Sequence, residues 1–180
     1  MPNDQPRAFV ALGTNLPFEG LAGAALLEHA LARLSQRGLN VRAVSSAWRS
    51  RALPRGDQPD FVNAVAWVEA AQSPKEFYRE LVAVEAAFGR TRGERWAART
   101  LDLDIIDMAA PPGTYDGIIV PHPRLAERAF VLAPLAEIAP DWRHPITGKS
   151  VEELLEAVAD QRLRRLGPLR LHVAQSRRDD

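Results

Sequence analysis

The chain has 180 residues, enough for one domain with its own hydrophobic core. Apolar residues make up 46% of it, and 23 basic residues balance 23 acidic ones, so the formal net charge is zero. That balance argues against binding nucleic acid or an anionic membrane by bulk electrostatics, and the absence of cysteine excludes disulfides, thiolate metal sites and cysteine nucleophiles. The polar start and the lack of an apolar stretch of about 20 residues favour a cytoplasmic protein.

The first half of the chain predicts a strand, a helix and two more strands. Residues 8–13 are a short apolar run that ends in the turn sequence GTN. A helical pattern runs over residues 19–36, and residues 39–50 predict the second strand. The third strand is expected over residues 61–70. It follows a polar loop, residues 51–60, whose length and composition indicate a functional role.

The second half begins with a strong helix start, in which Ser73, Pro74 and Glu76 form a capping box, and this helix is expected to end at Gly89. A half-buried strand follows over residues 101–105. Beyond it the sequence predicts a turn-rich stretch (109–117), a short apolar piece (118–120), a partly helical segment (130–139) and a last capped helix (150–159).

The order β-α-β-β-α-β predicts an α+β fold, the ferredoxin-like unit, with both long helices on one face of an antiparallel sheet. An irregular, partly helical region follows it. We expect a single domain over residues 1–160 and a C-terminal extension over residues 161–180 that is mobile at its end. Because this fold hosts many functions, the chemistry must be argued from the site.

The stretch with the most chemistry is residues 89–105. Arginines at positions 90, 92, 95 and 99 precede a strand on which Asp102 and Asp104 alternate with apolar residues. Residues i and i+2 of a strand share a face, so the two carboxylates aim the same way, with Cα atoms roughly 6–7 Å apart. Such a pair can hold one or two hard cations, and guanidiniums suit the phosphates of a magnesium polyphosphate. The alternative is simple surface pairing between the arginines and aspartates, which stabilises little.

Two further groups of side chains are candidate contacts. His122, between two prolines, can donate to a phosphate, act as a general base or be a structural turn residue. Phe61 and Phe130 are either core residues or a pair that sandwiches a flat heterocycle read by the amide of Asn63. Trp96, inside the arginine-rich loop, is expected to close over a ring ligand. The motifs GxxxxGK[ST], GxGxxG and HExxH are absent.

Five segments resemble one enzyme family in their order and spacing. They are FVALGTNL, DQPDFVNAV, VEAAFGRTR, ERWAARTLDLDI and VPHPRLAERAFVLAPLAEIAP, and the resemblance runs from about Phe9 to Pro140. The family is 6-hydroxymethyl-7,8-dihydropterin pyrophosphokinase of folate biosynthesis. The resemblance implies transfer of the β,γ-pyrophosphoryl group of ATP to the hydroxymethyl oxygen of a reduced pterin, with release of AMP.

The resemblance also implies roles for individual residues. Asp102 and Asp104 would hold two Mg²⁺ ions and form the catalytic set with Arg90 and Arg99. The nucleotide would be bound by Glu85, Arg92, Arg99, Ile105, His122 and Arg128. The pterin would be bound by Ser50, Leu53, Phe61, Asn63, Trp96 and Phe130, with Asn63 reading the ring edge. ATP and the pterin would be the only partners, so we expect no nucleic acid, no membrane and a monomer.

Three loops depart from the family's pattern. Ala97-Ala98 stands where Gly-Pro is usual, Arg51 replaces a usual proline, and the first turn reads GTNLPFEG. We expect these changes to affect loop closure and substrate affinity while leaving the metal pair intact. They motivate one alternative, a non-catalytic or retuned paralogue that binds Mg-nucleotide and a pterin-like ring. A second alternative, an RNA-binding ferredoxin-like module, is disfavoured by the zero net charge and the missing RNP strand.

Overall fold

The computed structural model describes residues 6–52, 58–90 and 98–171. Three of the candidate site residues, Leu53, Arg92 and Trp96, lie outside these ranges, and so does Ala97. Within the described ranges, no helix is both long and apolar enough to cross a membrane.

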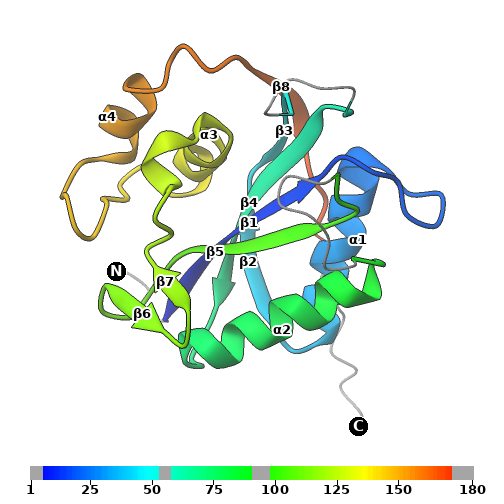
Figure 1. Ribbon diagram of the computed structural model, residues 1–180, viewed down its shortest axis with the longest axis horizontal. Coiled ribbons are helices and arrows are strands. Elements are labelled where there is room, and N and C mark those ends of the chain that lie inside the picture. Colours follow the sequence, from blue (N-terminus) through cyan, green and yellow to red (C-terminus); the bar gives the residue numbers. More distant parts are fainter. Residues whose placement is uncertain (1–5, 53–57, 91–97, 172–180) are drawn as a thin grey trace, which may run out of the picture.

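The fold is a mixed α/β structure built on one antiparallel sheet (Figure 1). Its main path runs β5 (Asp102–Met108), β1 (Arg7–Thr14), β4 (Phe61–Glu69), β3 (Ser46–Ser50) and β8 (Leu163–Pro168), while β2 (Asn40–Val44) also pairs with β4. All of these pairings are antiparallel. The predicted antiparallel sheet with helices is therefore confirmed.

Helices cover both faces of the sheet (Figure 1). The pair α1 (Gly23–Gln36) and α2 (Pro74–Ala87) lies on one face, and the pair α3 (Ala129–Ile138) and α4 (Val151–Glu156) lies on the other. A 3-10 turn, η1 (Leu125–Glu127), leads into α3, and β6 (Gly113–Tyr115) with β7 (Ile118–Val120) forms a separate hairpin.

The strands divide their side chains between two cores. On β1, Ala8, Val10 and Leu12 pack in the core beneath α1 and α2, whereas Phe9 packs in the core beneath α3 and α4. This is the period of two that a pleated strand imposes. Burial of these side chains on both faces fixes which residues of each strand point toward α3, and the site described below lies on that side.

The capping signals in the sequence are confirmed. Ser73 Oγ accepts from Glu76 N at 3.4 Å, while Glu76 Oε2 accepts from Ser73 N at 3.0 Å. Ser150 and Glu153 make the same reciprocal pair at the start of α4. That helix ends at Glu156 rather than near residue 159, because its last turn tightens to i→i−3 bonds such as Val158 N to Leu155 O.

Two element boundaries differ from the prediction. The first helix begins at Gly23 because residues 18–21 form a tight hairpin, with mutual Phe18–Leu21 backbone bonds of 2.9 Å and positive φ at Glu19 and Gly20. Residues 39–50 form two strands rather than one. They break at Ser45, whose hydroxyl accepts from Val65 N at 3.0 Å where a ladder carbonyl would otherwise lie.

The C-terminal segment contains a strand that the sequence pattern did not predict. Within residues 161–180, expected as an extension, β8 pairs with β3 from Ser46↔Pro168 to Ser50↔Leu163. Its consecutive arginines at 164 and 165 interrupt the alternation of apolar and polar residues by which a strand is recognised in a sequence. At least this part of the segment belongs to the sheet.

Glu137, near the end of α3, ties that helix to the edge of the sheet. Its carboxylate accepts from Ser46 N at 2.8 Å, Trp48 Nε1 at 2.8 Å and Arg165 Nε at 3.1 Å. Burial raises the pKa of this carboxyl, but hydrogen bonds from Ser46, Arg165 and Trp48 together outweigh it and leave the pKa below its ordinary value.

Glu137→Gln is expected to lower the free energy of unfolding by about 1–3 kcal/mol near neutral pH, because charge-assisted bonds become neutral ones. The folded-state pKa is lowered, so the carboxylate's contribution is present above the ordinary value of 4.5 and is lost as the pH falls through the folded-state pKa. Urea unfolding followed by circular dichroism should therefore show a difference in unfolding free energy between the wild type and Glu137→Gln that becomes smaller toward about pH 4. Asp141→Asn, at an exposed carboxylate, is the control; a gap that is the same at both pH values would contradict the assignment.

Candidate active site

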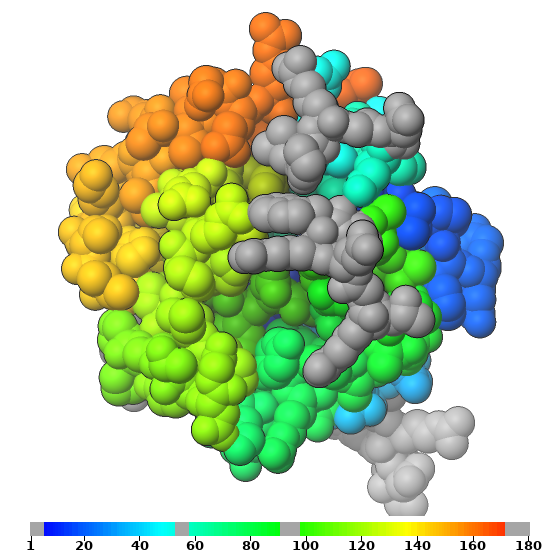
Figure 2. All heavy atoms as spheres, viewed as in Figure 1, coloured from blue at the N-terminus to red at the C-terminus, as the bar shows by residue number. Residues whose placement is uncertain are grey.

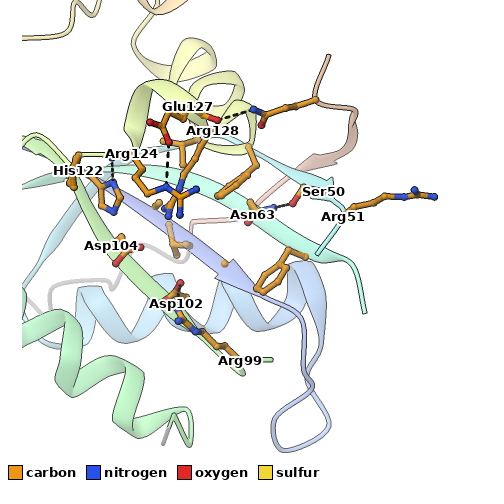
Figure 3. Close-up of a pocket in the computed structure, with 18 residues that line it drawn as sticks. Ser50, Arg51, Asn63, Arg99, Asp102, Asp104, His122, Arg124, Glu127 and Arg128 are labelled. Atoms are coloured by element: carbon orange, nitrogen blue, oxygen red, sulfur yellow. Dashed lines mark hydrogen bonds and ion pairs between the residues drawn. The ribbon is translucent and has the colours of Figure 1, made fainter. Parts of the chain in front are cut away.

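A cavity of about 720 Å³ lies on the α3 side of the sheet, over β1, β4 and β5 (Figure 3). The space-filling view shows the face of the molecule that is hollowed at its centre (Figure 2). Nine of the predicted site residues line the cavity: Ser50, Phe61, Asn63, Arg99, Asp102, Asp104, His122, Arg128 and Phe130. Residues from four separate stretches of the sequence, at 50, 61–63, 99–104 and 122–130, therefore meet in one place.

Strand register explains why the amide and the acid pair share the cavity floor. Gly13 of β1 pairs with Asn63 on one side and with Asp102 on the other, and Ala11 pairs with Asp104 in the next row. A Cβ at Gly13 would lie only 3.3 Å from Asn63 Oδ1, closer than ordinary van der Waals contact. Glycine therefore leaves room between the amide and the first carboxylate.

The amide end of the cavity is polar at its floor and aromatic at its walls. Asn63 is buried, and its Nδ2 donates to Ser50 Oγ at 2.9 Å, which orients the amide (Figure 3). Phe61 comes from β4 and Phe130 from α3, so the two rings belong to different sides of the cavity. This arrangement suits a flat heterocycle with hydrogen-bonding edges.

At the other end, Asp102 is paired with two arginines. Arg99 Nη1 lies 2.6 Å from Asp102 Oδ2, and Arg90 Nη1 lies 2.6 Å from Asp102 Oδ1. Arg90 also pairs with the buried Glu85, whose Oε1 accepts from Leu103 N at 2.7 Å. Mutual pairing of arginines and aspartates, the alternative weighed from the sequence, is thus realised at Asp102.

Asp104 has a different electrostatic environment. Burial and, after it, the charge of Asp102 raise its pKa, the charges of Arg128, Arg90 and Arg99 oppose them, and the net pKa is about 6. A bound cation would favour the charged form of this carboxylate. No cluster of three or more metal-ligating side chains occurs in the part of the chain that the structure describes. Two carboxylates nevertheless fit Mg²⁺, which commonly takes one or two of them together with substrate phosphates.

His122 is held as a neutral donor. Its Nδ1 accepts from Arg124 N at 3.1 Å, and its own backbone N donates to Ile106 O at 2.7 Å. Burial and, after it, the charges of Arg128 and Arg124 lower its pKa, the charge of Asp102 opposes them, and the net pKa is about 4. With Nδ1 occupied, the ring proton resides on Nε2. This favours donation to a phosphate over the general-base role.

Arg128 lies in the cavity wall between the two ends. Its guanidinium is 5.6 Å from the centroid of the Phe130 ring, within the range of a cation–π contact. Burial lowers its pKa, and the facing charge of Asp104 opposes that effect. Arg128 therefore connects the aromatic wall with the acid pair.

Three predicted contacts are not brought into the cavity. Glu85 and Arg90 lie outside its lining and support Asp102 and β5 as described above. The side chain of Ile105 is buried in the core beneath α1 and α2, on the opposite face of the sheet from the carboxylates.

Sequence reasoning missed several residues that build the site. Gly13, Arg124, Glu127 and Gln161 all line the cavity. Gly13 could have been found, since it ends an apolar strand at a turn sequence. Gln161 could not, because it is distant in sequence from every motif.

Asn15, also missed, joins the first turn to two loops. Its Oδ1 accepts from Arg99 N at 2.7 Å, and Asn15 N and Leu16 N both donate to Arg99 O at 3.1 Å. Asn15 Nδ2 donates to Pro59 O at 3.2 Å. The GTN turn therefore positions the backbone of Arg99 beside the acid pair.

Comparison with known sequences agrees with the resemblance noted above. The model of the family 7,8-dihydro-6-hydroxymethylpterin-pyrophosphokinase (HPPK) matches residues 9–140. A 2-amino-4-hydroxy-6-hydroxymethyldihydropteridine pyrophosphokinase of Synechocystis is 41% identical over 163 residues, which cover 87% of this chain and 80% of the relative. A protein of the same name from Pseudomonas aeruginosa is 41% identical over 162 residues, covering 89% and 96%.

Solved structures show the same fold at lower sequence identity. A crystal structure of HPPK-DHPS in complex with substrates aligns with a TM-score of 0.64 at 11% identity, over 87% of this chain and 44% of that one. Wild-type HPPK-DHPS of Plasmodium falciparum with SDX-DHP aligns with a TM-score of 0.63 at 12% identity, over 86% and 44%. This chain thus spans less than half of those structures. With the family match and the two close relatives, it follows that the chain belongs to the 7,8-dihydro-6-hydroxymethylpterin-pyrophosphokinase family.

Proposed function

We propose that this cavity catalyses the transfer of the pyrophosphoryl group of ATP to 6-hydroxymethyl-7,8-dihydropterin, giving the pterin diphosphate and AMP. The chain is an ATP-dependent diphosphokinase of folate synthesis, the activity for which its curated relatives are named. The observation that carries the assignment of the cavity is the strand register. It places an amide flanked by aromatic residues and a carboxylate pair flanked by arginines on either side of one glycine.

The acid end is suited to a magnesium triphosphate. Asp102 and Asp104 would hold the metal, and two Mg²⁺ ions are expected. When bound, these ions would neutralise phosphate charge and align the reacting groups. Arg99 both pairs with Asp102 and lines the cavity. When a cation replaces Arg99 as the partner of Asp102, the guanidinium can bind a phosphate instead. His122 and Arg128 supply two further donors on the opposite wall.

The amide end is suited to the pterin. Asn63 offers hydrogen bonds to the ring edge, and Phe61 and Phe130 offer faces for stacking. A ring held there lies one strand away from the carboxylates, since only β1 separates β4 from β5. The hydroxymethyl oxygen can then attack the β-phosphorus as the bond to the departing AMP breaks, and its proton leaves to solvent. Positioning and charge neutralisation do most of the catalysis.

Further features remain predictions. The strand order β5-β1-β4-β3 supports the ferredoxin-like topology. The single domain is proposed from the sequence, although β8 extends it past the expected boundary at residue 160. The monomeric state, the cytoplasmic location and the roles of Leu53, Arg92 and Trp96 are proposed from the sequence as well. Arg51, which replaces a usual proline, lines the cavity, so a retuned paralogue with altered ring specificity is the second candidate.

Asp102→Asn and Asp104→Asn are each expected to lower turnover at least about 100-fold while preserving the circular dichroism spectrum, since each removes a carboxylate proposed to hold the metal. The assay is release of AMP from Mg-ATP in the presence of the hydroxymethyl dihydropterin. Asp141→Asn serves as the surface control. Formation of ADP, or Mg-ATP binding without AMP from the wild type, would overturn the proposal, and the latter result would favour the retuned paralogue.

Asp104→Asn is also expected to stabilise the metal-free protein. The folded-state pKa of Asp104, about 6, lies above the ordinary 3.8, so the cost of this carboxyl to folding builds up as the pH rises from 3.8 to about 6, is complete above about 6 and is absent below 3.8. The melting temperature in chelator should therefore rise by about 2–4 °C near pH 7.5, with no difference near pH 3.5. A lower melting temperature near pH 7.5 would show that the Asp104 carboxylate is stabilising.

Gly13→Ala tests the close approach on the cavity floor. The added methyl would lie 3.3 Å from Asn63 Oδ1, so the amide must shift by a few tenths of an ångström. We expect the KM for the pterin to rise about 10-fold. The dissociation constant of an Mg-ATP analogue should change less. Equal changes in both constants would argue against a specific link between Gly13 and the ring site. Gly113→Ala, where an added Cβ would meet no atom closer than 3.9 Å, is the control for folding.

A further inference from the structure

Gln161 connects the C-terminal segment to the wall of the active site. Its Nε2 donates to Glu127 O at 2.8 Å, and its Oε1 accepts from Ala129 N at 3.0 Å. Gln161 also lines the cavity, although it lies beyond residues 9–140, which the family model matches. A side chain from outside the family's matched region thus reaches the site itself.

The two bonds of Gln161 bracket Arg128. The Glu127 carbonyl belongs to the peptide unit before Arg128, and the Ala129 N–H belongs to the unit after it. Arg128 itself is extended, with φ −122° and ψ 98°, between η1 and α3 (Figure 3). Because both flanking peptide planes are held, the direction in which the Arg128 side chain leaves the backbone is fixed.

The first turn of α3 has no cap of its own. Its N-cap residue is Arg128, which makes no side-chain capping bond, so Gln161 Oε1 satisfies the first free helical N–H from another segment. Gln161 is in turn anchored by its backbone N to Val158 O at 3.0 Å, and its chain continues into β8, where Leu163 pairs with Ser50.

We propose that Gln161 is a positioning residue for Arg128, so that the C-terminal segment completes the phosphate end of the active site. The inference rests on the proposed function. Gln161 acts by holding the guanidinium of Arg128 in the cavity, where it faces Asp104 and lies over Phe130. A misplacement of about 1 Å at such a group can lower a rate up to about 100-fold.

The test removes both bonds while preserving side-chain length. Gln161→Met is expected to weaken binding of a non-hydrolysable Mg-ATP analogue about 10-fold by calorimetry and to lower kcat/KM for ATP about 10- to 100-fold. Arg162→Met, at the exposed neighbouring residue, is the matched control and should leave both unchanged. Gln161→Glu keeps the acceptor for Ala129 N but sets a carboxylate against the Glu127 carbonyl, so it should show the same defect if the Met variant does not fold.

A double-mutant cycle with Arg128→Ala separates positioning from a loss of stability. If Gln161 acts through Arg128, then Gln161→Met changes kcat/KM by less than about 2-fold once Arg128 is absent. An equal loss in both backgrounds, or an unaffected Gln161→Met, would overturn this inference while leaving the proposed function standing. Failure of the wild type to release AMP would instead overturn the proposed function.

Discussion

The pairing of Gly13 with Asn63 on one side and with Asp102 on the other is the constraint on which the site depends. A slip of one residue in either ladder would turn the amide or the carboxylates to the opposite face. The slip is prevented by the core, because Ala8, Val10 and Leu12 alternate with the site-facing positions of β1 and are almost fully buried. Hydrophobic burial on one face of the sheet thus sets the spacing between the amide end and the acid end of the cavity on the other face.

The two carboxylates at the acid end of the cavity differ in how far neighbouring positive charges compensate them. Asp102 is paired with Arg90 and Arg99, whereas Asp104 has its pKa raised by burial and by Asp102. A group whose charged form is disfavoured in the free protein lowers stability, and enzymes commonly keep such groups where a ligand later relieves the cost. The same strand therefore carries one carboxylate that is paired with arginines and one whose charged form is disfavoured in the free protein.

Much of this could be read from the sequence because it depends on local periodicity. Alternation along residues 101–105 correctly put Asp102 and Asp104 on one face of their strand, alternation along residues 61–67 put Asn63 on one face with Phe61, and the capping boxes predicted two helix starts. The same alternation sends the side chain of Ile105, which the resemblance assigns to nucleotide binding, into the core on the opposite face.

What could not be read depends on contacts between distant residues. The break at Ser45 follows from its hydroxyl bonding Val65, and the docking of Arg99 follows from Asn15. β8 is recognised as a strand only through its pairing with β3, because its own residues are largely charged. No single-sequence pattern specifies partners that are many residues apart.

These distant contacts converge on α3, the helix that presents Phe130 and follows Arg128. Gln161 holds its first turn, and Arg165 meets Glu137 near its end, so the C-terminal segment contacts the helix at both ends. Ser46 and Trp48 of β3 add two more bonds to Glu137. A shift of this helix along the sheet would break the hydrogen bond from Ala129 and three hydrogen bonds to the charged carboxylate of Glu137. Phe130 is therefore carried by a helix that the C-terminal segment holds at both of its ends.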